Sequence, residues 1–328
     1  MRSEVLDMQK FPDFIEVACA ANIGYLPHVA ALMGSIAENH PNGSVRVHFL
    51  HDESVGLSEL KMLTAFAREV GLQCVTYQPS VADLGELPMS QRYPALVWYR
   101  VLLPELLGHL DRVIYLDADT LVLQSLAPLW SMDLSGHVLG AVEDITVVED
   151  KHIPFDIGLK HARDYFNSGV LLMHLKEMRA CNFGRDVIQM AKGHGFRFPD
   201  QMALNAVAKG HWMHLHPEWN CMIPLVCGHP RAMRRAEMTS LQREASDSPR
   251  ILHFEGWGQH NKPWHFRCKH PFQHLYLKYR AQTPWPLVRL QDTTIKNRLM
   301  RLVPQALLSP WYRLKRWGLK WGYAKNDG

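Results

Sequence analysis

Three short apolar segments alternate with two amphipathic ones at the start of the chain, and this alternation limits the fold more than any other sequence feature. Residues 14–19, 45–50 and 72–77 have the composition of buried or half-buried strands. Residues 25–39 and 57–70 carry apolar residues at helical spacing. This order implies parallel strands joined by right-handed crossovers. We therefore expect an α/β fold with an open, mostly parallel, Rossmann-like sheet and flanking helices.

The same kind of pattern continues to about residue 282 without a repeat or a clear linker. The sequence Thr-Pro-Trp-Pro at 283–286 then breaks it, and a basic segment follows. We expect one domain over residues 1–282 and an appendage over residues 283–328. The further elements expected in the domain are helices at 94–107, 184–192 and 201–209 and strands within 112–124, 138–142, 169–173 and 251–254.

The composition is that of an ordinary globular protein, with 47% hydrophobic and 21% charged residues. No stretch approaches the roughly 20 apolar residues of a membrane-spanning helix. The first residues, MRSEVLDMQKFPDF, are too acidic and interrupted for a secretory signal, which predicts a cytoplasmic protein. The six cysteines form no CxxC pair, so neither a disulfide framework nor a zinc cluster is expected.

The segment RVIYLDADTLVLQ, residues 112–124, places two carboxylates inside an apolar run. Residues i and i+2 of an extended chain point to the same side, so Asp117 and Asp119 can converge just past a strand end. In open α/β sheets ligands bind at that edge. The pair could hold a divalent cation that bridges to phosphate oxygens, or it could cap backbone amides in a turn. The spacing alone leaves both interpretations open.

A phosphatase of the haloacid-dehalogenase type is a more specific alternative, because it uses an apolar strand followed by D-x-D-x-T. Here Thr120 directly follows Asp119, one position too early. More than a hundred residues of α/β pattern also precede the motif, which that family places near the N-terminus. Both differences disfavour the phosphatase.

Three later segments favour a metal site. A polar Asn167-Ser168-Gly169 turn stands at the mouth of an apolar strand, and Asp200 and Gln201 open a helix. His253 follows Ile251-Leu252 at a strand end, where it is either a hydrogen-bonded core residue or a nitrogen ligand. Two aspartates and one histidine suit Mn²⁺ somewhat better than Mg²⁺.

Together these segments resemble the retaining glycosyltransferases of family 8, which include glycogenin and bacterial lipopolysaccharide galactosyl- and glucosyltransferases. The resemblance implies a GT-A fold for the catalytic domain and a UDP-linked sugar as donor. Six motifs carry it, in order: AANIGY (20–25), WYR (98–100), VIYLDADTLV (113–122), YFNSGVLLMHL (165–175), PDQMALN (199–205) and HFEG…KPW (253–264).

The resemblance also assigns roles to residues. It implies that Asp117, Asp119 and His253 bind the metal, and that Asp200, Gln201 and Asn167 surround the donor sugar and take part in catalysis. The remaining residues expected to contact the UDP-sugar are Ala21, Asn22, Tyr25, Arg100, Ala118, Gly256 and Lys262, with the last two at the diphosphate.

Three departures from the family pattern concern the nucleotide. Asn22 stands where many relatives carry an acid against the base, although its amide can still accept a hydrogen bond from uracil. Gly24 replaces a side chain that often touches the nucleotide. Five residues, WGQHN, separate Gly256 from Lys262 where two are common.

The expected chemistry is hexose transfer with retained anomeric configuration. A metal and a lysine would stabilise charge on the leaving diphosphate. Retention could use same-face attack by the acceptor, which we favour. The other route is a covalent intermediate, for which Asp200 is a better nucleophile than the amide of Gln201.

The C-terminal appendage is basic. Residues 289–328 hold nine Lys/Arg and two Asp, a local charge of +7, so the rest of the chain carries −3 of the total +4. Ser309-Pro310 predicts a helix start, after which tryptophans and basic residues separate onto different sides. This pattern predicts attachment to an anionic membrane surface, with a helix packed on the protein's own body as the alternative. Nucleic acid is not expected, because the body is acidic.

The sequence therefore predicts a cytoplasmic enzyme, peripheral at the inner face of a membrane. It would move glucose or galactose from a UDP-sugar, with Mn²⁺ or Mg²⁺, to a lipopolysaccharide core or another glycolipid or saccharide acceptor. The alternatives are a D-x-D-type phosphohydrolase and a catalytically inactive glycan-binding scaffold.

Overall fold

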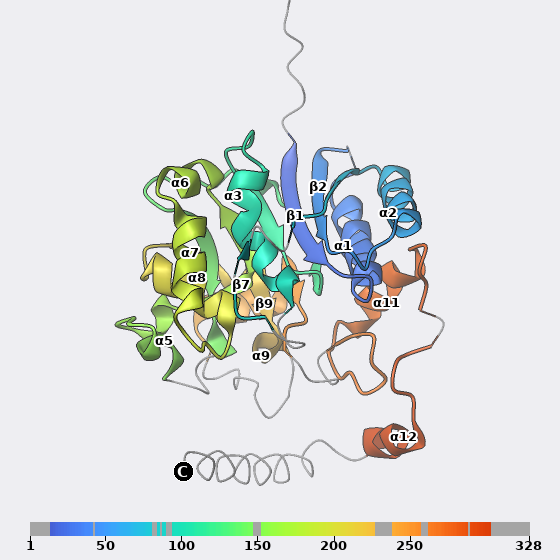
Figure 1. The fold of residues 1–328 in the computed structure, drawn as a ribbon. Helices are drawn as coiled ribbons and strands as arrows, with labels where there is room; N and C mark the ends of the chain where they lie inside the picture. Colours follow the sequence, from blue (N-terminus) through green and yellow to red (C-terminus); the bar gives the residue numbers. More distant parts are fainter. Residues whose placement is uncertain are drawn as a thin grey trace, which may run out of the picture.

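A computed structural model of the chain describes residues 14–41, 43–80, 84–85, 87–89, 94–146, 152–226, 238–256, 262–287 and 289–302. Its central feature is a seven-stranded sheet in the order β3-β2-β1-β4-β7-β6-β8 (Figure 1). β7 runs antiparallel to both of its neighbours, and the other paired strands are parallel. The strands are β1 (Ile15–Ala21), β2 (Val45–His51), β3 (Gln73–Tyr77), β4 (Val113–Leu116), β6 (Leu139–Glu143), β7 (Phe166–Met173) and β8 (Met213–His214).

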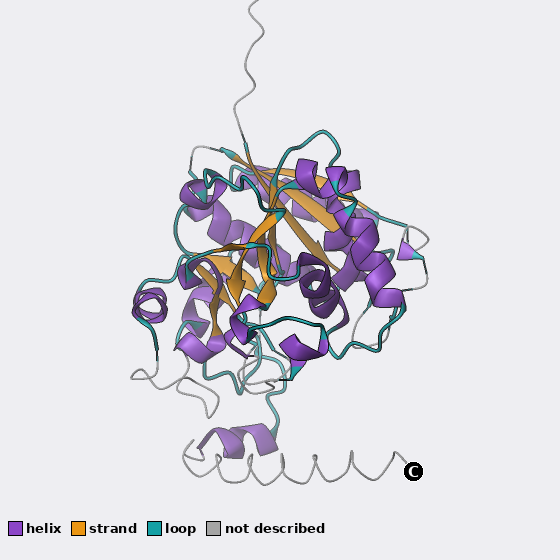
Figure 2. Cartoon of the chain, turned by 90° about the vertical axis from the view of Figure 1, so that its left-hand side faces the viewer, coloured by secondary structure: helices purple, strands orange, loops and turns teal. Residues whose placement is uncertain are grey.

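Helices cover both faces of this sheet, as Figure 2 shows with the sheet running between them. The strands alternate their side chains between two apolar clusters, so β4 sends Ile114 and Leu116 to one and Val113 and Tyr115 to the other. One face carries α1 (Leu26–Glu38), α2 (Leu57–Glu69) and α11 (Gln273–Ala281). The other carries η2 (Ala95–Leu102), α3 (Leu103–Leu106), α6 (Leu175–Ala180), α7 (Phe183–Lys192) and α8 (Pro199–Ala208). The predicted open, mostly parallel α/β fold with flanking helices is confirmed.

A second, three-stranded sheet in the order β5-β10-β9 lies at the edge where β4 ends. β10 (Ile251–His253) runs antiparallel to β5 (Thr120–Val122) and parallel to β9 (Cys221–Met222). The last residue of β10, His253, pairs with Thr120, and Thr120 directly follows Asp119 in the sequence. The small sheet therefore brings together segments more than 100 residues apart in sequence.

Two predicted elements differ in the structure. The helix expected over 94–107 is a 3₁₀-helix over η2 and a single α-turn in α3, because Pro104 has no N–H to continue an α-helix from η2. The polar turn expected at 167–169 lies inside β7, which begins at Phe166. Its polar side chains are buried there because other side chains supply their hydrogen bonds, as described below.

The remaining elements complete the body and reach the start of the appendage. They are α4 (Ala127–Trp130), α5 (Ile153–Asp156), η4 (Ala162–Asp164), η5 (Pro217–Asn220), α9 (Ile223–Val226), α10 (Ser240–Asp247) and α12 (Ile295–Leu302). Among the described residues, no helix is both long and apolar enough to cross a bilayer. The basic, tryptophan-containing helix predicted after Ser309 lies outside the described residues.

Candidate active site at the end of β4

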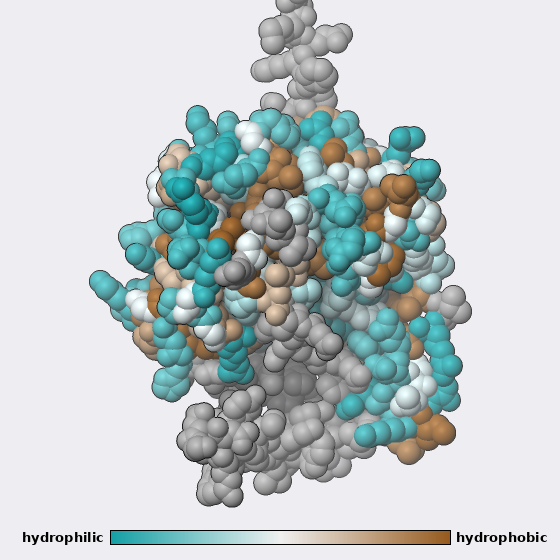
Figure 3. All heavy atoms as spheres, in the orientation of Figure 1, coloured by the Kyte–Doolittle hydropathy of each residue, from teal (hydrophilic) through white to brown (hydrophobic). Residues whose placement is uncertain are grey.

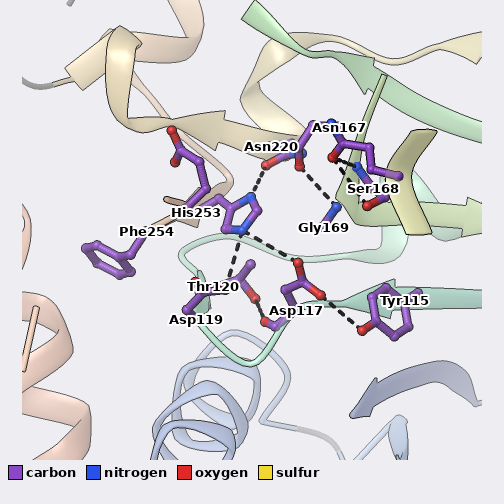
Figure 4. A network of polar contacts seen from close by, with 12 residues as sticks. Tyr115, Asp117, Asp119, Thr120, Asn167, Ser168, Gly169, Asn220, His253 and Phe254 are labelled. Atoms are coloured by element: carbon purple, nitrogen blue, oxygen red, sulfur yellow. Dashed lines mark hydrogen bonds and ion pairs between the residues drawn. The ribbon is translucent and has the colours of Figure 1, made fainter. Parts of the chain in front are cut away.

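The two aspartates occupy the turn between β4 and β5. The Asp117 N–H donates to the Gly169 carbonyl at 2.8 Å, and the Thr120 N–H and hydroxyl both donate to the Asp117 carbonyl, at 3.1 and 2.8 Å. The Phe254 N–H donates to the Asp119 carbonyl at 3.0 Å. These backbone bonds hold the turn, so both carboxylates are left to face the edge of the small sheet (Figure 4).

His253 completes a cluster of three candidate metal ligands. Its Nε2 lies 3.8 Å from Asp117 Oδ2 and 3.4 Å from Asp119 Oδ1, and one ligand atom from each residue lies within 4.8 Å of the others. Its Nδ1 lies 2.9 Å from Asn220 Oδ1, which assigns the proton to Nδ1 and leaves Nε2 aimed at the carboxylates. Three acceptors that face one another in this way fit a divalent cation.

Gly169 makes room for this cluster. A Cβ built on it would lie 2.2 Å from His253 Cε1 and 2.8 Å from Asp117 Oδ2, distances that no side chain tolerates. The sequence alone predicts no site role for Gly169. Its place in the Asn-Ser-Gly stretch is the one hint in the sequence. The close approach of His253 results from the pairing of β10 with β5, which the local sequence around Gly169 does not reveal.

Lys262 reaches one of these two carboxylates, that of Asp119. Its Nζ contacts Asp119 Oδ2 and donates to the Phe254 carbonyl at 2.9 Å. Burial opposes charge on both groups, but their mutual attraction outweighs it. The pKa of Lys262 is raised, and the pKa of Asp119 is held well below its usual value, with help from His253. The longer connection between Gly256 and Lys262, five residues where two are common, therefore does not carry the lysine away from the site.

Arg100 supports the cluster through Asp117. Its Nη2 lies 3.0 Å from Asp117 Oδ1 and 3.5 Å from Asp200 Oδ2, and its Nη1 donates to the Ser168 carbonyl at 2.6 Å. Burial is the main influence on Asp200 and raises its pKa, while the guanidinium of Arg100 opposes that shift. This buried arginine joins the metal cluster to the start of α8.

A second network joins Asn167 and Gln201 through a residue that the sequence analysis missed. Asp144, 4% exposed just after β6, accepts hydrogen bonds from Gln201 Nε2 at 2.8 Å and Asn167 Nδ2 at 3.3 Å. The Oε1 of Gln201 accepts from the Ser168 N–H at 3.0 Å, and Asn167 Oδ1 accepts from Asn220 at 2.9 Å. Asp144 carried no sequence signal, since one acid after a strand is common.

The other predicted nucleotide contacts lie around this centre. Ala21 ends β1, and Asn22 uses its Oδ1 to accept a hydrogen bond from the Tyr25 N–H at 3.2 Å, just before α1. Tyr25 packs edge-on against Trp264, with ring centroids 5.8 Å apart. Ala118 lies between the aspartates, and Gly256 has a φ of 88°, in the left-handed region that favours glycine. Contact of these residues with a nucleotide stays a prediction.

The sheet order, the carboxylate pair past β4 and the histidine from the small sheet match the GT-A glycosyltransferase fold that the sequence predicts. The sequence pattern described as Glycosyl transferase family 8 matches residues 16–268, most of the chain. The chain therefore belongs to glycosyltransferase family 8, which confirms the predicted resemblance and favours a glycosyltransferase over a phosphohydrolase.

Individual relatives agree with this assignment. The chain is 26% identical over 281 residues to General stress protein A of Bacillus subtilis, covering 83% of this chain and 95% of that protein. It is 24% identical over 274 residues to the Lipopolysaccharide 1,2-glucosyltransferase of Escherichia coli K12, covering 83% and 79%. The structure of the galactosyltransferase LgtC with donor and acceptor sugar analogs matches with a TM-score of 0.70 at 24% identity, over 88% of this chain and 100% of that one. This last likeness supports the fold.

Proposed function

We propose that the protein is a metal-dependent, retaining hexosyltransferase that moves glucose or galactose from a UDP-sugar. The convergence of Asp117, Asp119 and His253 beside the Lys262 ammonium carries this proposal. The three ligand atoms suit Mn²⁺ or Mg²⁺, and the lysine adds the positive charge that a diphosphate requires. Membership of family 8 supports transfer of a glycosyl group.

The residues of this site act mainly on the leaving diphosphate, which gains negative charge as the sugar–phosphate bond breaks. A bound divalent cation supplies electrostatic stabilisation of those oxygens. Lys262 stays protonated because its pKa is raised, and it donates to a phosphate oxygen when its contact with Asp119 is exchanged for the substrate. The left-handed φ of Gly256 allows the backbone to approach the same phosphates.

We favour retention of configuration through same-face attack by the acceptor. Asp200 is paired with Arg100, and both polar atoms of the Gln201 amide are hydrogen-bonded to protein groups. Neither residue is therefore presented as a free nucleophile, and with Asn167 they are better placed to bind the donor sugar. Covalent labelling of Asp200 or Gln201 by a slowly reacting donor would contradict this route.

The acceptor is proposed to be a lipopolysaccharide core or another glycolipid or saccharide, and the site of action the cytoplasmic face of a membrane. The glucosyltransferase relative acts on lipopolysaccharide by its name. Residues 283–328 form a segment with a net positive charge, which suits binding to anionic lipid. At its described end, α12 exposes Ile295 and Leu299 at 79% and 62%, and Figure 3 shows an apolar group at the edge where α12 lies.

A donor screen tests the enzymatic proposal. UDP release would be measured with Mn²⁺ from UDP-glucose, UDP-galactose and their N-acetyl forms, with and without a glycolipid acceptor. We expect Mn²⁺-dependent release from one of the two hexose donors, and a loss of more than about 100-fold in Asp119→Asn, since even outer-shell partners of metal ligands are worth about 10–100-fold.

Asp133→Asn is the matched control, at an aspartate whose carboxylate accepts hydrogen bonds from the N–H and hydroxyl of nearby Ser135. It should release UDP at the wild-type rate. Release from no donor, together with phosphate liberated from a generic monoester, would reverse the assignment in favour of a phosphohydrolase. UDP binding without any release would instead favour the inactive glycan-binding scaffold.

A further inference from the structure

The chain just before α12 runs beside the segment that carries Lys262. We call residues 289–293 the strap. Within it, the Gln291 N–H donates to the Trp264 carbonyl, and the Phe266 N–H donates to the Gln291 carbonyl, both at 2.9 Å. His265 and Gln291 thereby form a parallel β-bridge. The strap, which belongs to the start of the appendage, is therefore hydrogen-bonded to Trp264, two residues after Lys262.

A close contact between two side chains reinforces this bridge. His265 Nδ1 lies 2.8 Å from Asp292 Oδ2, with side chains 17% and 38% exposed. Asp292 has a φ of 58°, a left-handed conformation that aspartate and asparagine adopt more readily than most residues. The Asp292 carbonyl also accepts a hydrogen bond from Asn297 Nδ2 at 2.8 Å, which connects the strap to α12.

Two helices of the body also contact the Lys262 segment, residues 262–266. The Trp264 ring stacks on His28 of α1, with centroids 3.6 Å apart and planes at 19°. Gln273 at the start of α11 donates to the Pro263 carbonyl at 2.8 Å. Lys262 itself lies 5.7 Å from the Trp264 ring centroid. The segment is therefore held from one side by α1 and α11 and along its edge by the strap.

We propose that the strap positions Lys262 for the donor diphosphate, with His265 and Asp292 as positioning residues that act through the backbone of 262–266. This inference rests on the proposed use of a UDP-sugar. A flexible lysine loses rotamer and backbone freedom when it binds phosphate, and a backbone fixed in advance lowers that cost. The appendage thereby becomes part of the donor site and is more than a membrane anchor.

The full-length protein with Asp292→Asn tests this inference. Asparagine keeps the left-handed backbone and removes the charge. We expect the Kd for UDP, measured by calorimetry with Mn²⁺, to rise roughly threefold, the scale of one partly exposed side-chain contact. His265→Gln, which changes the other partner of the same contact, should raise the Kd for UDP by a similar factor. Glu244→Gln is the control, because Glu244 forms a similar partly exposed contact with a histidine, 3.5 Å from His216 Nε2, between α10 and η5. Its Kd should equal that of wild type.

A double-mutant cycle separates positioning from a general loss of stability. If the strap acts through Lys262, Asp292→Asn should have no further effect on the UDP Kd in a Lys262→Ala background. An equal threefold effect in both backgrounds, or no effect of either strap variant in the wild-type background, would overturn the inference. Failure of the wild-type protein to bind UDP would overturn the proposed donor as well, so the two failures are distinguishable.

Discussion

The carboxylate of Asp119 contacts both a lysine and a histidine. Lys262 contacts one of its oxygens, and His253 Nε2 lies 3.4 Å from the other. Without a cation, burial lowers the pKa of His253, but the hydrogen bond and charge of Asp119 outweigh that and raise it. Protonation of the imidazole therefore competes with metal binding, and metal affinity should weaken as the pH falls.

Gly169 gives the sharpest test of this cluster. In Gly169→Ala, the new methyl group would occupy space held by His253 and Asp117, so the imidazole and a carboxylate must separate. We expect Mn²⁺ affinity, measured by electron paramagnetic resonance of free Mn²⁺, to fall by about tenfold or more, as it does when outer-shell support of a metal ligand is lost. UDP release should fall with it.

Gly193→Ala is the matched control, because a Cβ at that position would meet nothing within 4 Å. It should bind Mn²⁺ as the wild-type protein does. Wild-type Mn²⁺ affinity in a folded Gly169→Ala protein would show that Asp117 and His253 do not share a metal.

Helices and strands with a clear local hydrophobic pattern could be predicted from the sequence. β4 is a buried apolar run, and the end of such a strand in an α/β sheet is a known ligand edge, which located Asp117 and Asp119. The start of β7 could not be predicted in this way. Asn167 and Ser168 have turn character, and only partners distant in sequence, Asp144, Asn220 and Gln201, make them suitable for a buried strand.

The connection between β10 and α11 contains a histidine that should make stability depend on pH. His270 is 4% exposed and packs on Phe254, with ring centroids 4.5 Å apart, and burial lowers its pKa to about 3. Below pH 6.5 the unfolded chain takes up a proton that the folded protein does not, so this contribution is intact above pH 6.5 and is lost as the pH falls toward 3. By pH 5 the loss should reach about 2 kcal/mol.

The measurement is urea unfolding of wild type and His270→Asn at pH 7.5 and pH 5. Asparagine does not titrate, and its amide oxygen can accept the Phe272 N–H that His270 Nδ1 accepts at 3.2 Å. The free energy of unfolding should drop by about 2 kcal/mol less in the variant than in wild type over this interval. Equal drops in both proteins would mean that His270 is protonated in the folded state.

The charge of the whole molecule is divided between an acidic body and a basic C-terminal segment. Residues 289–328 carry +7 against −3 for the rest of the chain. α12 lies at this boundary and below the body in Figure 1. Ile295 and Leu299, one helical turn apart, are exposed beside Lys296 and Arg298. An apolar stripe with basic neighbours suits the interface of an anionic bilayer.

Membrane attachment predicts both a salt dependence and a dependence on these two side chains. The wild-type protein should sediment with vesicles that contain anionic phospholipid, less so with zwitterionic vesicles, and binding should weaken as NaCl is raised, because the attraction is screened. Ile295→Ser with Leu299→Ser should weaken binding roughly tenfold, since each side chain loses apolar area that the interface would bury. Leu241→Ser removes a 49% exposed leucine of α10 and should leave binding unchanged. A wild-type protein that stays in solution, or a double variant that binds as tightly as wild type, would contradict attachment through α12.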